Sequence, residues 1–279
     1  MNASYQQLLV HLDATGRSRT RLDVARALAQ QHGAALTALY AATPSYVAMP
    51  YPGGVASDFA VRIQAIDDER RGRARAIFDA AARQGEPLAA WSEVDEPPVI
   101  GAFAQQALFA DLLVLGQHEP SGAESDEVPA DFAEAVIATS GKPGLIIPYT
   151  GTFDRIGETV VIAWNASREA ARAVAAALPL LQRARSVHIL SWAAPDATVQ
   201  GARLDLNSYL RQHGVRAQWH SDASEPPELA DLLLSRAFDL QADLLVMGCY
   251  GHSRAREWVL GGTSRTVLRT MTLPVLMAH

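Results

Sequence analysis

The sequence predicts an α/β protein built from two tandem Rossmann-like domains, each with a doubly wound and mainly parallel sheet. Two observations support this class. Short apolar runs alternate with segments of helical periodicity, a pattern typical of right-handed βαβ connections. The order of these segments also occurs twice, and 279 residues are enough for two hydrophobic cores of ordinary size.

The local patterns assign the elements in order. In the first copy we expect a strand at 7–13, a helix at 19–32, a strand at 34–41, a long helix at about 58–84, a strand at 88–94, a helix before Asp111, a strand that ends at Gly116, and a closing helix and strand. The second copy repeats this order, with helices at 168–182, 202–213 and 227–240 and strands at 186–192, 216–220 and 242–247. It is shorter between its second and third strands.

An internal repeat relates the two halves of the chain. Residues 109–116 (FADLLVLG) are echoed at 241–248 (QADLLVMG), and residues 8–13 (LLVHLD) are echoed at 160–165 (VVIAWN). Because the echoes keep the same order along the chain, we expect two copies of one domain.

The boundary between the copies is expected near residue 150, which gives domains at 1–150 and 151–279. Residues 143–147 and 274–277 are Pro-led apolar runs that each follow a helical segment, so each is interpreted as the last strand of its copy. We expect the copies to pack as an intramolecular pseudo-dimer. A pairing of the final strands across the copies would explain their similar ends.

The composition excludes several classes of protein. Hydrophobic residues make up 49% of the chain and charged residues 19%, which is ordinary for a folded globular protein. The formal net charge of −6 argues against a nucleic-acid partner, which usually requires a basic face. The sequence shows no signal-peptide pattern and no apolar run of membrane-spanning length. The single cysteine, Cys249, agrees with a reducing compartment, so we expect a cytoplasmic protein.

A glycine-rich segment follows the apolar run 242–247 and precedes a helical pattern. Glycines there allow positive φ angles and close backbone approach to a ligand, and the N–H groups that open the next helix attract anions. The segment therefore predicts a phosphate site, although a tight strand-to-helix turn would use the same glycines. We expect this segment to bind a cofactor together with Asn165, which follows the first strand of the same copy. The expected cofactor-binding residues are Asn165, Gly248, Gly251, Gly261, Gly262, Thr263 and Ser264.

These motifs resemble the universal stress protein family, and specifically its tandem two-domain members. Nucleotide-binding members carry an Asp after the first strand and a Gly-x2-Gly-x9-Gly-Ser/Thr pattern after the fourth. Gly248, Gly251 and Gly261 match the three glycines, and the resemblance covers nearly the whole chain. It implies a role in the stress response and ATP or another adenine nucleotide as the ligand. It leaves open whether Mg²⁺ accompanies the nucleotide.

The second copy departs from this pattern at two positions. Gly262 occupies the Ser/Thr position, although Thr263 and Ser264 follow directly, and Asn165 replaces the Asp. An amide offers both a donor and an acceptor, so contacts to a ribose hydroxyl or an adenine amino group remain available.

The first copy keeps the Asp after the first strand, as Asp13, but departs from the pattern after its fourth strand. Glu119 stands at the second glycine position, and Ala130 and Asp131 stand at the last glycine and hydroxyl positions. Acidic groups there repel phosphate, so no nucleotide is expected in this copy.

No set of residues points to catalysis or to a metal. Cys249 and His252 form an isolated pair, and no Ser/His/Asp order or paired-carboxylate motif is present.

Three functions therefore remain open. The first is a stress-response protein that acts by binding small molecules or an unknown protein partner, the second is an ATP-binding sensor that uses the C-terminal copy, and the third is a slow nucleotide hydrolase. We favour the first of these functions, and binding over catalysis. An apolar ligand beneath the loop at 46–55 and a homodimer also remain open.

Overall fold

The computed structural model describes residues 3–47, 57–94, 96–120, 127–192, 204–221, 228–249 and 262–279. The chain forms two compact units, one of Tyr5–Lys142 and one of Met1–Ser4 together with Pro143–His279. Both are α/β units, as the alternation of apolar and helical segments predicts.

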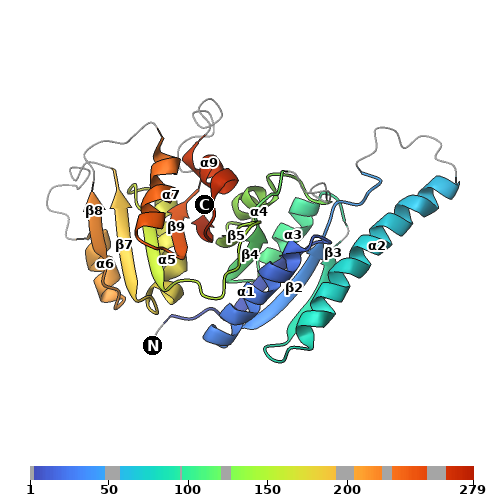
Figure 1. Cartoon of the computed structure of the whole chain (residues 1–279), viewed down its shortest axis with the longest axis horizontal. Coiled ribbons are helices and arrows are strands. Elements are labelled where there is room, and N and C mark those ends of the chain that lie inside the picture. Colours follow the sequence, from blue (N-terminus) through green and yellow to red (C-terminus); the bar gives the residue numbers. More distant parts are fainter. Residues whose placement is uncertain are drawn as a thin grey trace. The chain divides into compact units, whose positions relative to one another are not determined.

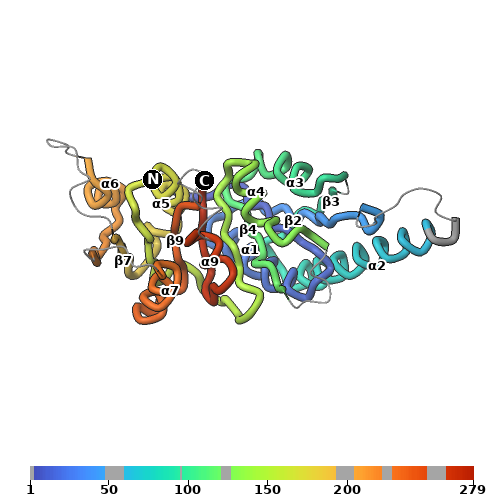
Figure 2. Tube along the Cα trace, turned by 90° about the horizontal axis from the view of Figure 1, so that it is seen from above, coloured from blue at the N-terminus to red at the C-terminus, as the bar shows by residue number. Residues whose placement is uncertain are grey.

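The first unit is a parallel sheet covered by helices. Its elements are β1 (Gln7–Leu12), α1 (Arg17–His32), β2 (Ala35–Ala41), α2 (Ser57–Ala82), β3 (Ala89–Val94), α3 (Val99–Ala107), β4 (Leu112–Gly116) and α4 (Phe132–Ser140). The strand order is β3-β2-β1-β4, with parallel neighbours throughout. Helices α1 and α2 cover one face of this sheet, and α3 and α4 cover the other (Figure 1, Figure 2).

The second unit repeats this arrangement. Its elements are β5 (Gly144–Ile147), β6 (Thr159–Ala163), α5 (Arg168–Leu181), β7 (Ser186–Ser191), α6 (Leu206–Gln212), β8 (Gln218–Ser221), α7 (Leu229–Asp239), β9 (Leu244–Gly248), α9 (Thr263–Thr270) and β10 (Val275–Ala278). The strand order is β5-β10-β9-β6-β7-β8. Helices α5 and α6 cover one face and α7 and α9 the other (Figure 2). As predicted, the connection between the second and third strands is shorter, since α6 has 7 residues and α2 has 26.

The registers of the central strands confirm the internal repeat. Leu8 pairs with Leu112 between β1 and β4, and Val160 pairs with Leu244 between β6 and β9. These are the residues that the two sequence echoes align. The central strand pair of each unit is therefore built in the same parallel register, as expected for two copies of one doubly wound domain.

β5 closes the first copy in sequence but pairs with the last strand of the second copy. Leu145 lies opposite Leu276 in an antiparallel ladder between β5 and β10. This is the pairing of final strands that the sequence predicts. The compact units consequently divide after Lys142, whereas the repeat boundary near residue 150 stays a prediction about the sequence copies.

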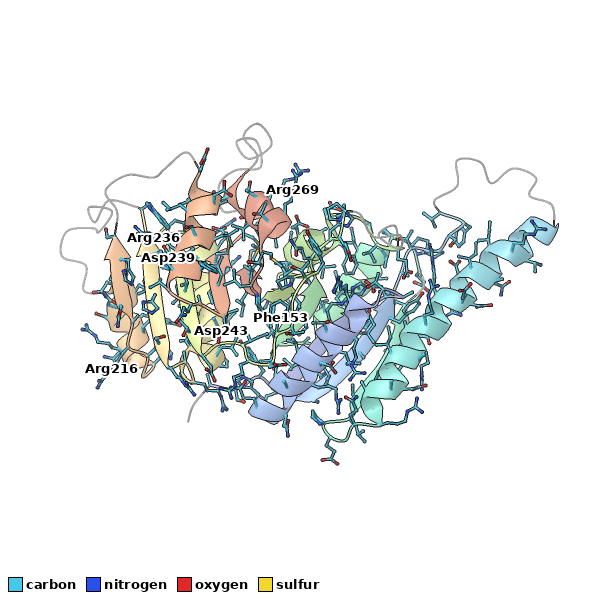
Figure 3. All side chains as sticks on the ribbon, viewed as in Figure 1. Phe153, Arg216, Arg236, Asp239, Asp243 and Arg269 are labelled. Carbon is cyan, nitrogen blue, oxygen red and sulfur yellow. The ribbon has the colours of Figure 1, made fainter. Side chains whose placement is uncertain are left out.

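An aspartate before the fourth strand has the same role in both copies. Asp111 Oδ2 accepts hydrogen bonds from the backbone N–H groups of residues 6 and 7, at 2.7 and 3.0 Å. The carboxylate of Asp243 (Figure 3) accepts them from the backbone N–H groups of residues 157–159, at 2.9–3.2 Å. The repeated Ala-Asp-Leu-Leu sequence thus ties the fourth strand to the segment that enters the first strand.

Candidate nucleotide site

The strand order of the second unit reverses between β6 and β9. In doubly wound folds such a point forms a crevice at the carboxyl ends of the strands, where ligands bind. Ala163 at the end of β6 pairs with Met247 of β9. Asn165 lies two residues beyond β6, and Gly248 is the last residue of β9. Two of the predicted site residues therefore lie at this edge of the sheet.

The amino end of α9 carries three further predicted residues. Gly262 precedes the helix in an extended conformation, and as a glycine this N-cap residue has no side chain with which to cap the helix. Within the described part of the chain, the backbone N–H groups of Thr263 and Ser264 have no hydrogen-bond partner. Unbonded N–H groups at a helix amino end carry a partial positive charge and bind anions. This end of α9 can therefore hold a phosphate.

Gly248 also has a packing role. A Cβ atom at this position would lie 2.5 Å from the backbone nitrogen of Ala170 and 2.6 Å from the carbonyl carbon of Glu169. The first turn of α5 therefore leaves room only for glycine at the end of β9. This contact alone is sufficient to require glycine at 248, with or without a ligand.

Asn165 is exposed and takes part in the turn that begins α5. Its Oδ1 accepts a hydrogen bond of 3.3 Å from the backbone nitrogen of Ser167. Ser167 in turn caps α5, because its Oγ accepts a 3.1 Å hydrogen bond from the Ala170 nitrogen. The Nδ2 group of Asn165 has no acceptor among the described residues, so it is available as a donor to a ligand.

Glu169 is a charged residue of this region that sequence reasoning misses. It is buried in the first turn of α5, and its Oε1 accepts a short hydrogen bond from Arg168 Nε. Burial raises the pKa of the carboxyl, but the hydrogen bond and charge of Arg168, together with weaker contributions that include the backbone N–H of Glu169, outweigh burial and hold the pKa below its usual value. An ionised carboxylate beside Gly248 disfavours a phosphate at that point. The sequence did contain a signal for its position: Glu169 follows Ser167 by two residues, and an acidic residue shortly after a Ser N-cap is typical of the first turn of a helix.

Two predicted site residues, Gly251 and Gly261, lie outside the described residues. The same holds for His252 and for most of the loop at 46–55. Among the residues that are described, no group of three or more His, Cys, Asp or Glu side chains is arranged to hold a metal ion.

A buried ion pair occupies the corresponding crevice of the first unit, between β1 and β4. Asp13 follows β1, and its Oδ2 accepts from Arg21 Nη2 at 2.7 Å, with both side chains almost fully buried. Arg21 Nε also donates to the backbone carbonyl of His11 at 3.0 Å. A Cβ atom on Gly116 would lie 2.3 Å from Arg21 Nη1. The guanidinium therefore fills the space over the end of β4.

Asp13 is also bound within the turn that follows it. Its Oδ1 accepts hydrogen bonds from the backbone nitrogen of Thr15 and from the hydroxyl group of Ser18, at 3.0 and 2.8 Å. Burial raises the pKa of this carboxyl, but the charges of Arg21 and His11 and the hydrogen bonds from Thr15 and Arg21 together outweigh burial and hold the pKa below its usual value. Sequence reasoning left open whether Asp13 binds a ligand or stabilises a turn, and in this structure it stabilises the turn.

Arg21 itself was missed from the sequence. It lies on the face of α1 that contains Ser18, Leu22 and Ala25, which are all buried. A charged residue on the apolar face of a predicted helix was the available signal, because a buried charge requires a partner.

The fold defines a class of protein, namely a tandem pair of doubly wound α/β units in which the strand order of each sheet reverses. Residues 228–279 match the sequence profile described as the Universal stress protein family. Among solved structures, a universal stress protein from Archaeoglobus fulgidus DSM 4304 matches with a TM-score of 0.70 and 16% identity, over 98% of this chain and 95% of its own. A functionally unknown protein from Pseudomonas aeruginosa PAO1 matches with a TM-score of 0.56 and 16% identity, over 98% of this chain and 92% of its own.

No curated protein matches the sequence. The other findings nevertheless confirm the resemblance that the motifs predict. The C-terminal residues 228–279 carry the sequence pattern of the universal stress protein family, and the chain as a whole has the fold of a universal stress protein with two tandem units. In the described part of the chain, no helix combines the length and the apolar character that crossing a membrane requires.

Proposed function

We propose that the second unit binds an adenine nucleotide such as ATP, and that the protein acts in the stress response through binding rather than catalysis. The proposal rests mainly on the amino end of α9, which no described residue caps. The backbone N–H groups of Thr263 and Ser264 follow the glycine-rich segment and have no partner among the described residues. A phosphate would satisfy them and would interact favourably with the helix dipole.

The remaining charges suggest an orientation for the ligand. The phosphates would lie at Thr263 and Ser264, with Gly251 and Gly261 allowing close approach of the backbone. The ionised carboxylate of Glu169 opposes a phosphate beside Gly248. The nucleoside would therefore lie toward Asn165, whose free Nδ2 group can donate to a ring nitrogen or a hydroxyl.

Only one copy of the domain is proposed to bind the nucleotide. In the copy at 1–150, Arg21 forms an ion pair with the carboxylate of Asp13, and its guanidinium group also fills the space over Gly116. In the copy at 151–279, the uncharged Asn165 stands at the position of Asp13. The asymmetry between the copies supports a sensor with one nucleotide per chain.

Calorimetric titration with ATP tests the proposal. We expect one ATP per chain, and we expect Gly261→Asp to weaken binding by about tenfold or more, because it places a carboxylate where the phosphate requires close approach. Gly116→Asp is the matched control in the other copy and should leave the affinity unchanged. Equal losses in the two variants, or no saturable heat at millimolar ATP, would refute the assignment. Release of phosphate over time would identify a slow hydrolase instead.

A further inference from the structure

A pocket of about 520 Å³ lies in the first unit at the carboxyl ends of β1 and β4. This volume is within the range of small-molecule sites. The walls include the guanidinium groups of Arg17 and Arg21, and also the apolar side chains of Val128, Pro129 and Phe132. The pocket therefore offers polar donors on one side and an apolar surface on the other.

Arg21 is a buried residue with one donor nitrogen that the described part of the chain does not use. The residue is only 5% exposed. Its Nε and Nη2 are engaged by the His11 carbonyl, the Asp13 carboxylate and the Ser18 hydroxyl, at 2.7–3.0 Å. Its Nη1 has no hydrogen-bond partner among the described residues. Since the other two nitrogens fix the guanidinium, Nη1 is held on the pocket wall beside Gly116.

The amino end of α1 lines the same pocket. This helix has 16 residues, its N-cap Gly16 offers no side chain, and its first turn contains no acidic residue. Within the described chain, the backbone N–H groups of Gly16 and Arg17 have no acceptor. The positive end of the helix dipole and the unused Nη1 of Arg21 are independent features that both favour an anion.

The carboxylates around the pocket limit the charge that a ligand can carry. Glu119 lies 3.7 Å from Arg17 Nε at the exposed side of the pocket, and the buried Glu127 lies 3.6 Å from Arg70 Nε. Arg21 is already matched by Asp13. The site thus provides donors with little excess positive charge. A planar carboxylate with a single charge fits a guanidinium edge and meets less repulsion than a phosphate dianion.

His11 adds an apolar wall rather than a charge. Its ring contacts the rings of Phe103 and Phe132, and its Nε2 is 2.8 Å from the carbonyl oxygen of Ala41. Burial, assisted by the charge of Arg21, lowers the pKa of the ring to about 4. The ring is therefore neutral at physiological pH, and the ligand body meets an uncharged surface there.

We propose that the first unit binds a small monocarboxylic acid. The carboxylate would be bound by Arg21 Nη1 and by the amino end of α1, with the apolar body against Val128, Pro129 and Phe132. This ligand differs from the nucleotide proposed for the second unit, and its site shares no residue with that one.

Titration of the full chain with benzoate, benzamide and phenyl phosphate tests the proposal. The three probes share one ring but carry one negative charge, none, and up to two. Benzoate should bind saturably at one per chain, and the other two should bind at least about tenfold more weakly, because only benzoate matches both the donors and the charge. Gly116→Ala forces the guanidinium out of place and should abolish benzoate binding.

Arg17→Gln provides a variant at a partly exposed position, with Arg19→Gln on the same helix but outside the pocket lining as its matched control. The first should weaken benzoate severalfold, and the second should not. Absence of saturable binding at millimolar benzoate, equal binding of benzamide, a preference for phenyl phosphate, or equal effects of the two variants would each overturn the proposal. ATP affinity should be the same in Arg17→Gln as in the unmodified chain, which separates this test from that of the nucleotide site.

Discussion

Asp13 and Arg21 are each the principal counter-ion of the other, and both are removed from water. Removal of one partner leaves an uncompensated buried charge. We expect Asp13→Ala to lower the free energy of unfolding by about 3 kcal/mol. Asp23→Ala is the matched control, because the exposed Asp23 pairs with Arg19 one turn away. Its effect should stay below about 1 kcal/mol. Urea denaturation measures both, and equal effects would show that the buried pair is not a stabilising feature.

His11 makes the stability of the first unit depend on pH. Its pKa in the folded chain is about 4, below the value of 6.5 expected when it is exposed. Between these values the unfolded chain binds more protons than the folded chain, so the stability contribution is complete above pH 6.5 and is lost as the pH falls toward 4. The loss should reach about 3 kcal/mol.

Comparison of unfolding curves between pH 4 and 7 measures this effect. His11→Gln should flatten the pH dependence in that range. If this variant keeps the pH dependence of the unmodified chain, His11 is not the group responsible.

Spacing and the repeat are enough to nominate some candidate site residues from the sequence. The glycines after β9 and the residue after β6 are predicted in this way. Arg21 and Glu169 were not, because their significance depends on what surrounds them in the fold. Charged residues are common on helices, and the sequence alone does not show that these two are buried.

At the scale of elements, the end of β9 and the start of α5 fit together through Gly248. A methyl group there would meet backbone atoms, which cannot rotate away as a side chain can. We expect Gly248→Ala to destabilise the protein by about 2 kcal/mol through displacement of α5. The melting temperature and the urea midpoint report the change.

Gly72→Ala is the comparison within a helix. Gly72 lies in α2, and a Cβ atom there would meet nothing within 4 Å. This variant should stabilise the chain by about 0.5–1 kcal/mol, because alanine loses less backbone entropy than glycine in a helix. A stable Gly248→Ala variant would mean that the first turn of α5 moves freely.

The order and type of the elements could be predicted because apolar periodicity is a local signal. The predicted ends of the helices and strands were less accurate. α6 begins at Leu206, although the periodic pattern begins near residue 202, because Asp205 caps the helix through a 2.7 Å hydrogen bond from the Ser208 nitrogen. α1 begins at Arg17, directly after Gly16, and therefore two residues earlier than the periodicity indicated.

At the scale of the whole molecule, one repeated sequence gives two units with the same central strand register but different crevices. The repeat was visible in the sequence because the strands are buried on both faces and retain apolar residues. The contents of the crevices were not visible there, since the positions of Arg21 and of the amino end of α9 depend on helix placement. We therefore propose a nucleotide for one crevice and a small acid for the other.

Photolabelling with 8-azido-ATP, followed by mass spectrometry of the peptides, tests directly which unit binds the nucleotide. We expect label on peptides from within residues 163–169 or 244–279, with protection by unlabelled ATP. We expect no protected label on peptides from within residues 10–21 or 112–120. Protected labelling mainly on those peptides of the first unit would contradict the assignment of the nucleotide to the second unit.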